Sequence, residues 1–115
     1  MKRDLDILKK LLAKIEEKKN LTPEPIELSE IGEDSINYHL RLLIDAEYIE
    51  AQVFGYGDVY PKRLTNKGHD FLELSRNETS WNKAKEIIKE KAPGVTLEIV
   101  KEVLSSITKS VLGLS

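Results

Sequence analysis

Residues 33–46 alternate between hydrophobic and polar positions with the period of a helix that buries one face. At 100° per residue, Ile36, Leu40 and Leu43 fall within one arc together with Ile44, and the opposite arc is polar. The pattern predicts an amphipathic helix with one packed face and one exposed face. The elements expected on either side are organised around this helix.

A β-hairpin is predicted directly after the helix. Residues 48–54 roughly alternate between apolar and polar types and are rich in β-branched and aromatic side chains. Turn residues follow at 55–58, and residues 59–64 run back as a second strand. Because Pro61 has no N–H to donate, we expect the return strand to be an edge strand or to stop pairing early.

Helices are predicted on both sides of this central region. Residues 4–19 repeat leucine and isoleucine at helical spacing beneath a lysine-rich outer face. Residues 65–76 predict a later helix with Thr65 as its N-cap, and we expect Asn77 to end that helix in a left-handed conformation. Helix, hairpin and helix in this order are typical of a winged-helix domain.

The segment between the first two helices fits this fold less well. Two prolines exclude a helix from residues 20–28, where Ile26 and Leu28 alternate with Glu27 as in a short strand that could join the hairpin as its third member. A helix-turn-helix normally has a separate short helix before the recognition helix, and only residues 29–32 remain for it. This shortfall argues against ordinary operator binding.

The fold class expected is therefore mainly α with a small β-sheet (α+β). We predict a winged helix-turn-helix-like domain over residues 1–77 and a two-helix C-terminal appendage over residues 78–115. At 115 residues, the chain is long enough for one compact domain of about 60–80 residues and such an appendage.

The appendage is predicted from its capping residues and its hydrophobic spacing. Thr79 or Ser80 is expected to cap its first helix, Pro93-Gly94 to stop it, and Thr96 to cap the second. Apolar residues of the last helix repeat at alternating three and four residues, which is the period of a coiled-coil seam. This stripe either packs on its own domain or forms a homodimer. Its positions are Leu97, Val100, Leu104, Ile107, Val111 and Leu114.

Charge is distributed unevenly, although the net charge is only −2. Residues 1–19 carry a net charge of +3, and their lysines form either a solvated face or a patch for nucleic acid or an acidic partner. Residues 29–60 contain one basic residue, Arg41, and seven acidic residues. The segment expected to face DNA is therefore the most acidic part of the chain.

Composition excludes several classes of site. Cysteine is absent, which excludes disulfides, thiolate chemistry and cysteine-based zinc sites. No apolar stretch follows the first four residues, and no run approaches the length of a membrane span. We therefore expect a cytoplasmic protein that makes no contact with a membrane.

The two histidines are the candidates for general-base or metal chemistry. His39 lies at the edge of the buried arc of its helix, and His69 lies in the first turns of the later helix. Neither has a neighbour at ligand spacing apart from Asp70, and a metal site normally needs three or four ligands. We interpret Gly55 and Gly57 as turn residues rather than a phosphate loop. The sequence thus predicts no enzyme activity, metal site or cofactor.

Two kinds of partner are compatible with the pattern. The first hypothesis is regulatory binding to double-stranded DNA, although so few basic residues offer few phosphate contacts unless the chain dimerises. The second is a protein-interaction module that does not bind DNA, because the exposed flank of the helix carries Leu42 beside acidic residues. The candidate nucleic-acid-binding residues are Asn37, Tyr38, Arg41, Tyr56, Lys62 and Arg63.

Several short motifs occur in order along the chain: residues 1–6, Tyr38-His39-Leu40 followed by Leu42-Leu43, residues 61–65, residues 68–72 and Trp81-Asn82-Lys83. Together they resemble those of a phage- and prophage-associated bacterial family of unknown function. The resemblance covers residues 1–90 and implies a small bacterial or phage-encoded protein with a winged-helix-like domain. It implies no established activity and no established site residues.

One position departs from the pattern of winged-helix proteins. They commonly carry a glycine between the recognition helix and the first wing strand, and Glu47 takes that place here. If the position adopts the left-handed conformation, glutamate costs about 1 kcal/mol relative to glycine. The alternative is that the helix continues for another residue.

Overall fold

The structure, a computed structural model, describes residues 1–91 and 95–113. Among these residues the chain forms five helices and one antiparallel pair of strands, which confirms a mainly helical α+β fold. The chain divides into two compact units, residues 1–69 and residues 70–115. The predicted boundary at residue 77 follows the third helix, whereas the two units meet within that helix.

Helix α1 (Leu5–Glu16) is shorter than the predicted 4–19. Its N-cap is Asp4, whose Oδ1 accepts hydrogen bonds from the N–H groups of Asp6 at 2.9 Å and Ile7 at 3.3 Å. After the helix, Asn20 Oδ1 accepts from the N–H of Thr22 at 3.0 Å, which stabilises a turn instead of a further helical turn. The buried face consists of Leu8, Leu11, Leu12 and Ile15.

Helix α2 (Glu33–Asp45) packs against α1 and against both strands of the hairpin. Its buried residues include His39, which is 1% exposed. The His39 Nδ1–H donates to the Ser35 carbonyl at 2.7 Å, and Nε2 accepts the backbone N–H of Asp4 at 2.9 Å. This neutral histidine therefore joins the start of α1 to α2, the structural hydrogen-bonding role that the sequence predicted.

Glu47 ends α2 in the left-handed conformation, with φ of 63°. The N–H of Glu47 donates to the Ile44 carbonyl and that of Tyr48 to the Leu43 carbonyl, both at 2.9 Å. These two bonds form a Schellman motif, which requires the left-handed residue and turns the chain into the first strand. Of the two alternatives that the sequence left open at Glu47, the structure shows the left-handed conformation and not a helix that continues for another residue.

The hairpin consists of strands β1 (Ile49–Val53) and β2 (Val59–Leu64). Ala51 lies opposite Pro61 and Glu50 lies opposite Arg63, so Lys62 is an extra residue in β2, a β-bulge. Pairing resumes after the bulge and continues to Leu64 opposite Ile49, so of the two alternatives expected for Pro61 the edge strand holds and the early end of pairing does not. Both strands are edges of this two-stranded sheet, as expected for a strand that contains proline.

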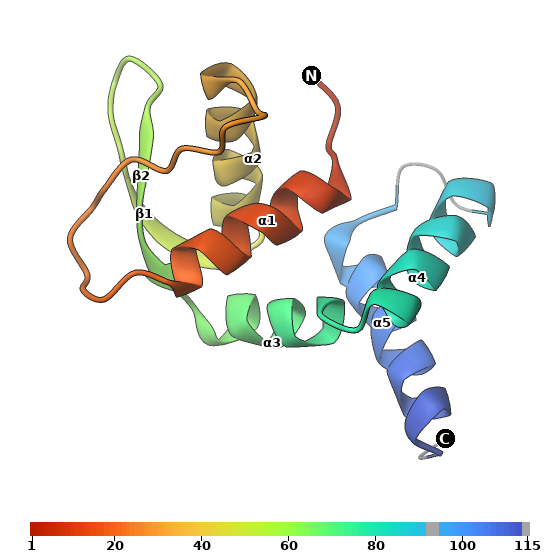
Figure 1. Cartoon of the computed structure of the whole chain (residues 1–115). Helices are drawn as coiled ribbons and strands as arrows, with labels where there is room; N and C mark the ends of the chain where they lie inside the picture. The colour runs from red at the N-terminus through yellow and green to blue at the C-terminus, as the bar shows by residue number, and fades with distance from the viewer. Residues whose placement is uncertain (92–94, 114–115) are drawn as a thin grey trace. The chain divides into compact units, whose positions relative to one another are not determined.

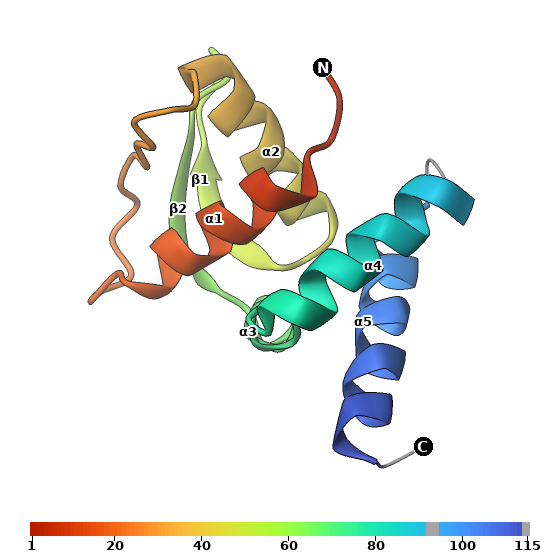
Figure 2. The same ribbon diagram turned by 45° about the vertical axis from the view of Figure 1, so that its right-hand side comes forward.

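The alternation of Ile26 and Leu28 suggested a third strand, but residues 20–32 form no strand and the sheet consists of β1 and β2. Figures 1 and 2 show this segment running past β2 to the start of α2. One backbone bond joins it to the strand, from the Glu24 N–H to the Pro61 carbonyl at 3.4 Å. Residues 29–32 form turns and no helix, so the short helix of a helix-turn-helix is absent from this described segment.

Helix α3 (Asn66–Ser75) begins with a close contact to the start of the hairpin. The N–H of Thr65 donates to the Tyr48 carbonyl at 2.9 Å, and the Thr65 Oγ1 accepts from the N–H of Gly68 at 3.2 Å, as predicted for an N-cap. A Cβ at Gly68 would lie 2.0 Å from the Tyr48 carbonyl oxygen. Only glycine permits this approach, because it has no side-chain atom there.

Asn77 does not end α3 in a left-handed conformation, because Glu47 is the one described non-glycine residue with positive φ. Its Oδ1 instead accepts the N–H of Ser80 at 2.9 Å, so Asn77 caps helix α4 (Glu78–Lys91). The predicted caps Thr79 and Ser80 therefore lie inside α4. Asparagine serves either end of a helix, and the sequence does not distinguish the two uses.

Helices α4 and α5 (Leu97–Leu112) pack together in the second unit. The Oγ1 of Thr96 accepts the N–H of Ile99 at 3.3 Å, which confirms the predicted cap of α5. Trp81 and Phe71 meet edge to face with ring centroids 6.2 Å apart. Buried hydrophobic residues described on α4 and α5 are Trp81, Ala84, Leu97, Val100 and Leu104. The predicted stop at Pro93-Gly94 and the seam position Leu114 lie outside the described residues.

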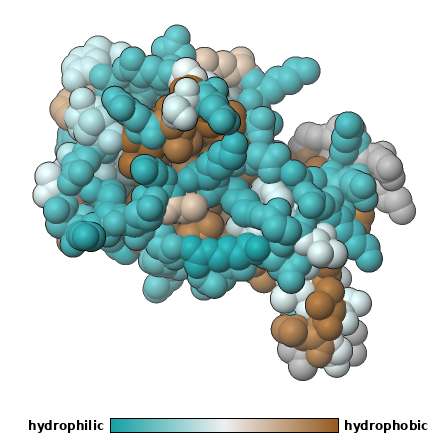
Figure 3. Space-filling view, viewed as in Figure 1, coloured by the Kyte–Doolittle hydropathy of each residue, from teal (hydrophilic) through white to brown (hydrophobic). Residues whose placement is uncertain are grey.

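The predicted seam on α5 changes its environment along the helix. Leu97, Val100 and Leu104 are buried within the chain, so they are already covered. Ile107 is half-buried, while Val111 is 64% exposed, and Figure 3 shows an apolar surface at the end of α5. Among the described seam positions, Ile107 and Val111 are therefore the ones available to a homodimer contact. None of the described helices combines the length and apolar character required to span a membrane.

Candidate functional site

The bulge in β2 determines how the two predicted wing cations point. Strand residues normally alternate between faces, and the extra residue Lys62 shifts this alternation by one position. As a result Pro61 and Leu64 are both buried, whereas Lys62 is half-buried and Arg63 is exposed. Two successive cations can therefore lie on the outer side of the hairpin.

These cations line a pocket of about 260 Å³ together with lysines from the end of α1. We call this the basic pocket. Lys18 and Lys19 come from the α1 side, Lys62 and Arg63 come from β2, and His69 comes from α3. One carboxylate, that of Glu16, also lies in the lining. With four cations against one carboxylate, the pocket favours an anion.

The four cations differ in how far they are already neutralised. Lys18 Nζ donates to the Thr22 carbonyl at 2.6 Å and lies 3.5 Å from Glu24 Oε1. Arg63 is ion-paired with Glu50 on the opposite strand. Lys19 and Lys62 form no ion pair with the other described residues. These two lysines are the cations most available to a ligand.

The outer face of α2 holds two further predicted residues, and neither lines the basic pocket. Arg41 is exposed, and Tyr38 is half-buried with its ring edge-on to His39 at 5.2 Å between centroids. Exposed carboxylates on the same helix are those of Glu33, Asp34 and Asp45. The outer face of α2 thus presents one cation and three carboxylates.

Asn37, predicted to contact bases, is used inside the fold. Its Nδ2 donates to Asp58 Oδ1 at 3.2 Å, and its Oδ1 accepts the backbone N–H of Val59 at 3.1 Å. Both bonds join α2 to the start of β2. The Asn37 amide therefore positions the hairpin against the helix.

The hairpin tip carries the remaining predicted residue, Tyr56, which is 75% exposed. Its ring stacks on Phe54 with centroids 5.6 Å apart, and Phe54 meets Tyr60 edge to face at 4.9 Å. Desolvation raises the pKa of the Tyr56 hydroxyl, and electrostatic interactions with Tyr60 and Asp58 raise that pKa further. The hydroxyl can donate a hydrogen bond, as any tyrosine hydroxyl can at neutral pH.

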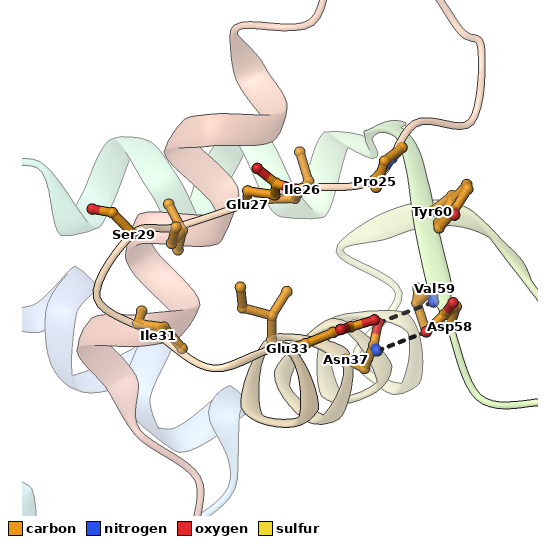
Figure 4. A pocket seen from close by; sticks show the side chains of 12 residues that line it. Pro25, Ile26, Glu27, Ser29, Ile31, Glu33, Asn37, Asp58, Val59 and Tyr60 are labelled. Atoms are coloured by element: carbon orange, nitrogen blue, oxygen red, sulfur yellow. Dashed lines mark hydrogen bonds between the residues drawn. The ribbon is translucent and has the colours of Figure 1, made fainter.

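A second concavity, which we call the acidic groove, has a volume of about 670 Å³. Figure 4 shows it between residues 25–31 on one side and α2 with β2 on the other. Carboxylates of Glu27, Glu33 and Asp58 lie in its lining, and Asn37 and Tyr60 add polar groups. Figure 3 shows apolar surface framed by hydrophilic side chains on the face that carries this segment.

The sequence predicted part of the basic pocket and none of the acidic groove. Lys62 and Arg63 were predicted contacts, and the lysines of α1 were one possible patch, but no sequence pattern joined Lys18 and Lys19 to the hairpin. The acidic groove was not predicted. The sequence feature that corresponds to it is Pro25-Ile26-Glu27-Leu28, in which a proline precedes a strand-like alternation. This segment does not pair as a strand of the sheet.

Comparisons with known proteins give a family but no activity. The family model described as "Hypothetical protein (DUF2513)" matches residues 2–94. An uncharacterised protein of Haemophilus influenzae (strain ATCC 51907 / DSM 11121 / KW20 / Rd) is 32% identical over 117 residues, which cover 97% of this chain and 99% of the relative. No solved structure matches the chain.

Proposed function

We propose that this chain, which belongs to the DUF2513 family, is a winged-helix protein that binds double-stranded DNA through the phosphate backbone of the DNA. The observation that carries this proposal is the basic pocket, where Lys18, Lys19, Lys62 and Arg63 converge from two elements. Phosphate contacts supply most of the affinity of DNA-binding proteins that read little sequence.

The order of elements supports the winged-helix assignment. In the first unit α1 is followed by α2, the hairpin and the start of α3, and the hairpin packs against α2 as a wing does. The Schellman turn at Glu47 joins α2 to β1, at the position where winged helices commonly have glycine. The resemblance to phage- and prophage-associated proteins favours a small regulator encoded by a bacterium or its phage.

The mode of contact we propose differs from reading of the major groove by α2. The outer face of α2 is acidic apart from Arg41, and Asn37 is already bonded to the hairpin. Phosphate repulsion would oppose deep insertion of this face. The hairpin and the end of α1 instead approach the backbone, and Tyr56 at the wing tip reaches toward the minor groove.

The test is a pair of charge-matched double variants. In K19Q/K62Q both lysines lose their charge, and no carboxylate loses a partner because neither lysine forms an ion pair within the described chain. The control K83Q/K89Q removes the same charge from two exposed positions of α4. Affinity for a short random duplex is measured by fluorescence anisotropy at low salt.

We expect K19Q/K62Q to weaken binding and to lower the slope of log K against log salt by about 0.9 for each lysine. The control should bind like the wild type. Equal weakening by both variants would mean that overall charge and not the basic pocket is responsible. Absence of DNA binding in the wild type would favour the alternative, a protein-interaction module.

A further inference from the structure

The acidic groove has a composition opposite to that of the basic pocket. Its twelve lining residues include three carboxylates and no lysine, arginine or histidine. Ile26, Leu28 and Ile31 line it as half-buried apolar side chains. Figure 4 shows the loop that carries these residues facing α2 across the groove. The groove thus combines negative charge with apolar surface.

The groove offers hydrogen-bond acceptors more readily than donors. The N–H of Val59 is taken by Asn37 Oδ1, and Pro61 has no N–H, while its carbonyl accepts from Glu24. This side of β2 therefore lacks the alternating N–H groups that an added strand would need. An occupant must be recognised through its side chains, and it must donate hydrogen bonds.

Two of the carboxylates are available for such an occupant. Glu27 and Glu33 are exposed and form no ion pair with other described residues, whereas Asp58 accepts a hydrogen bond from Asn37. Three negative charges around one groove repel phosphate and attract a cation. Arginine suits this lining, because its guanidinium has five donors and no acceptor.

The size of the groove argues for more than a single ion. Its volume of about 670 Å³ lies within the range of roughly 300–1,000 Å³ typical of sites that hold an organic ligand. The apolar residues Ile26, Leu28 and Ile31 would remain in water if a hydrated cation alone bound to the carboxylates. An occupant that carries aliphatic groups beside its charges covers both parts of the lining.

We propose that the acidic groove binds a segment of a partner protein in which arginine or lysine alternates with aliphatic residues. The partner's cations pair with Glu27 and Glu33, and its aliphatic side chains cover Ile26, Leu28 and Ile31. This site is separate from the basic pocket, since the two linings share no residue. The proposal therefore holds whether or not the chain binds DNA.

The experiment titrates the full ¹⁵N-labelled chain with a labelled peptide of alternating arginine and leucine. Amide shifts locate the site, and anisotropy gives the affinity. The variant E27Q/E33Q removes two carboxylates without changing side-chain shape. The control E98Q/E102Q removes two exposed carboxylates from α5. Glu98 lies in the first turn of α5, as Glu33 lies in the first turn of α2, so the two variants are matched in this respect. Circular dichroism verifies that both variants fold.

We expect the peptide to shift the amide resonances of Ile26, Leu28 and Ile31. We expect the affinity of E27Q/E33Q for the peptide to be about tenfold weaker, because the variant loses two exposed charge pairs with the peptide. The control should retain the wild-type affinity, and a peptide with glutamate in place of arginine should not bind.

Several results would overturn the proposal. They are no peptide binding, shifts outside the groove, equal weakening in both variants, or spermidine binding as tightly as the peptide. Self-association of the chain that is lost in E27Q/E33Q would assign the groove to a second copy instead of a partner.

Discussion

Replacing Gly68 by alanine tests the contact that attaches α3 to the start of the hairpin. The new Cβ would lie 2.0 Å from the Tyr48 carbonyl oxygen, where ordinary contacts begin at 3.4 Å. The first turn of α3 must therefore move away from Tyr48. Such a shift breaks the bond from Thr65 N–H to the Tyr48 carbonyl and that from Thr65 Oγ1 to the Glu47 carbonyl, at 2.9 and 2.6 Å.

The expected cost follows from three effects. Two lost hydrogen bonds cost about 1 kcal/mol each, and overpacking against backbone costs about 1–3 kcal/mol. Alanine favours a helix over glycine by about 1 kcal/mol, which offsets part of the loss. We therefore expect Gly68→Ala to lower the free energy of unfolding by about 2–4 kcal/mol, a large fraction of the roughly 5–15 kcal/mol of a typical domain.

Urea denaturation followed by circular dichroism measures this change. The matched control is Gly55→Ala, because no atom lies within 4 Å of the added Cβ and the backbone there does not require positive φ. The control should change stability by less than about 0.5 kcal/mol. If Gly68→Ala also stays within that limit, α3 is not fixed to Tyr48 and the reasoning is refuted.

Three further changes have defined outcomes. Glu47→Gly should raise stability by about 0.5–1 kcal/mol, because glycine relieves the strain of the left-handed conformation. The ion pair with Lys67 that is lost is exposed and contributes little. A loss of stability in urea denaturation would contradict this prediction. Asn37→Ala should lower stability by about 1–3 kcal/mol, because the buried Val59 loses the acceptor for its N–H. The control is Asn82→Ala at an exposed position. Equal effects of the two variants in urea denaturation would refute the role of Asn37 in positioning the hairpin. Val111→Asp should abolish any self-association seen by light scattering, and persistence of that association would place the dimer contact elsewhere.

Elements with strong hydrophobic periodicity were predictable from the sequence. The residues that form β2 and the start of α2 agree with the prediction, because a sustained spacing of apolar residues defines a packed face. Capping rules also identified Thr65 and Thr96 at the starts of α3 and α5. These features depend on near neighbours in the chain, which the sequence displays directly.

Features that depend on distant contacts were not predictable. The alternation of Ile26 and Leu28 suggested a third strand, but such a short pattern does not reveal whether a neighbouring edge can bond to it. At Pro61 and Lys62 the proline removes a donor and the bulge changes the register. Asn77 has the chemistry for either end of a helix, and the start of α4 decides its role.

The candidate site shows the same limit. Lys62 and Arg63 were identified as cations on a predicted wing, but their common direction results from a bulge that no local motif indicates. Asn37 has a side chain suited to base recognition, yet its two bonds to Asp58 and Val59 connect positions more than twenty residues apart. Residue type alone therefore did not indicate the structural contacts that this side chain makes.

The salt dependence of DNA binding by the wild-type chain tests the proposed function most directly. Anisotropy with a short random duplex is recorded from about 50 to 200 mM salt, the range over which phosphate contacts weaken strongly. With two to four cations of the basic pocket on phosphates, we expect log K to fall against log salt with a slope of about −2 to −4 per chain. Light scattering on the same sample gives the number of chains bound. No binding at the lowest salt, or binding that does not change with salt, would contradict the proposal.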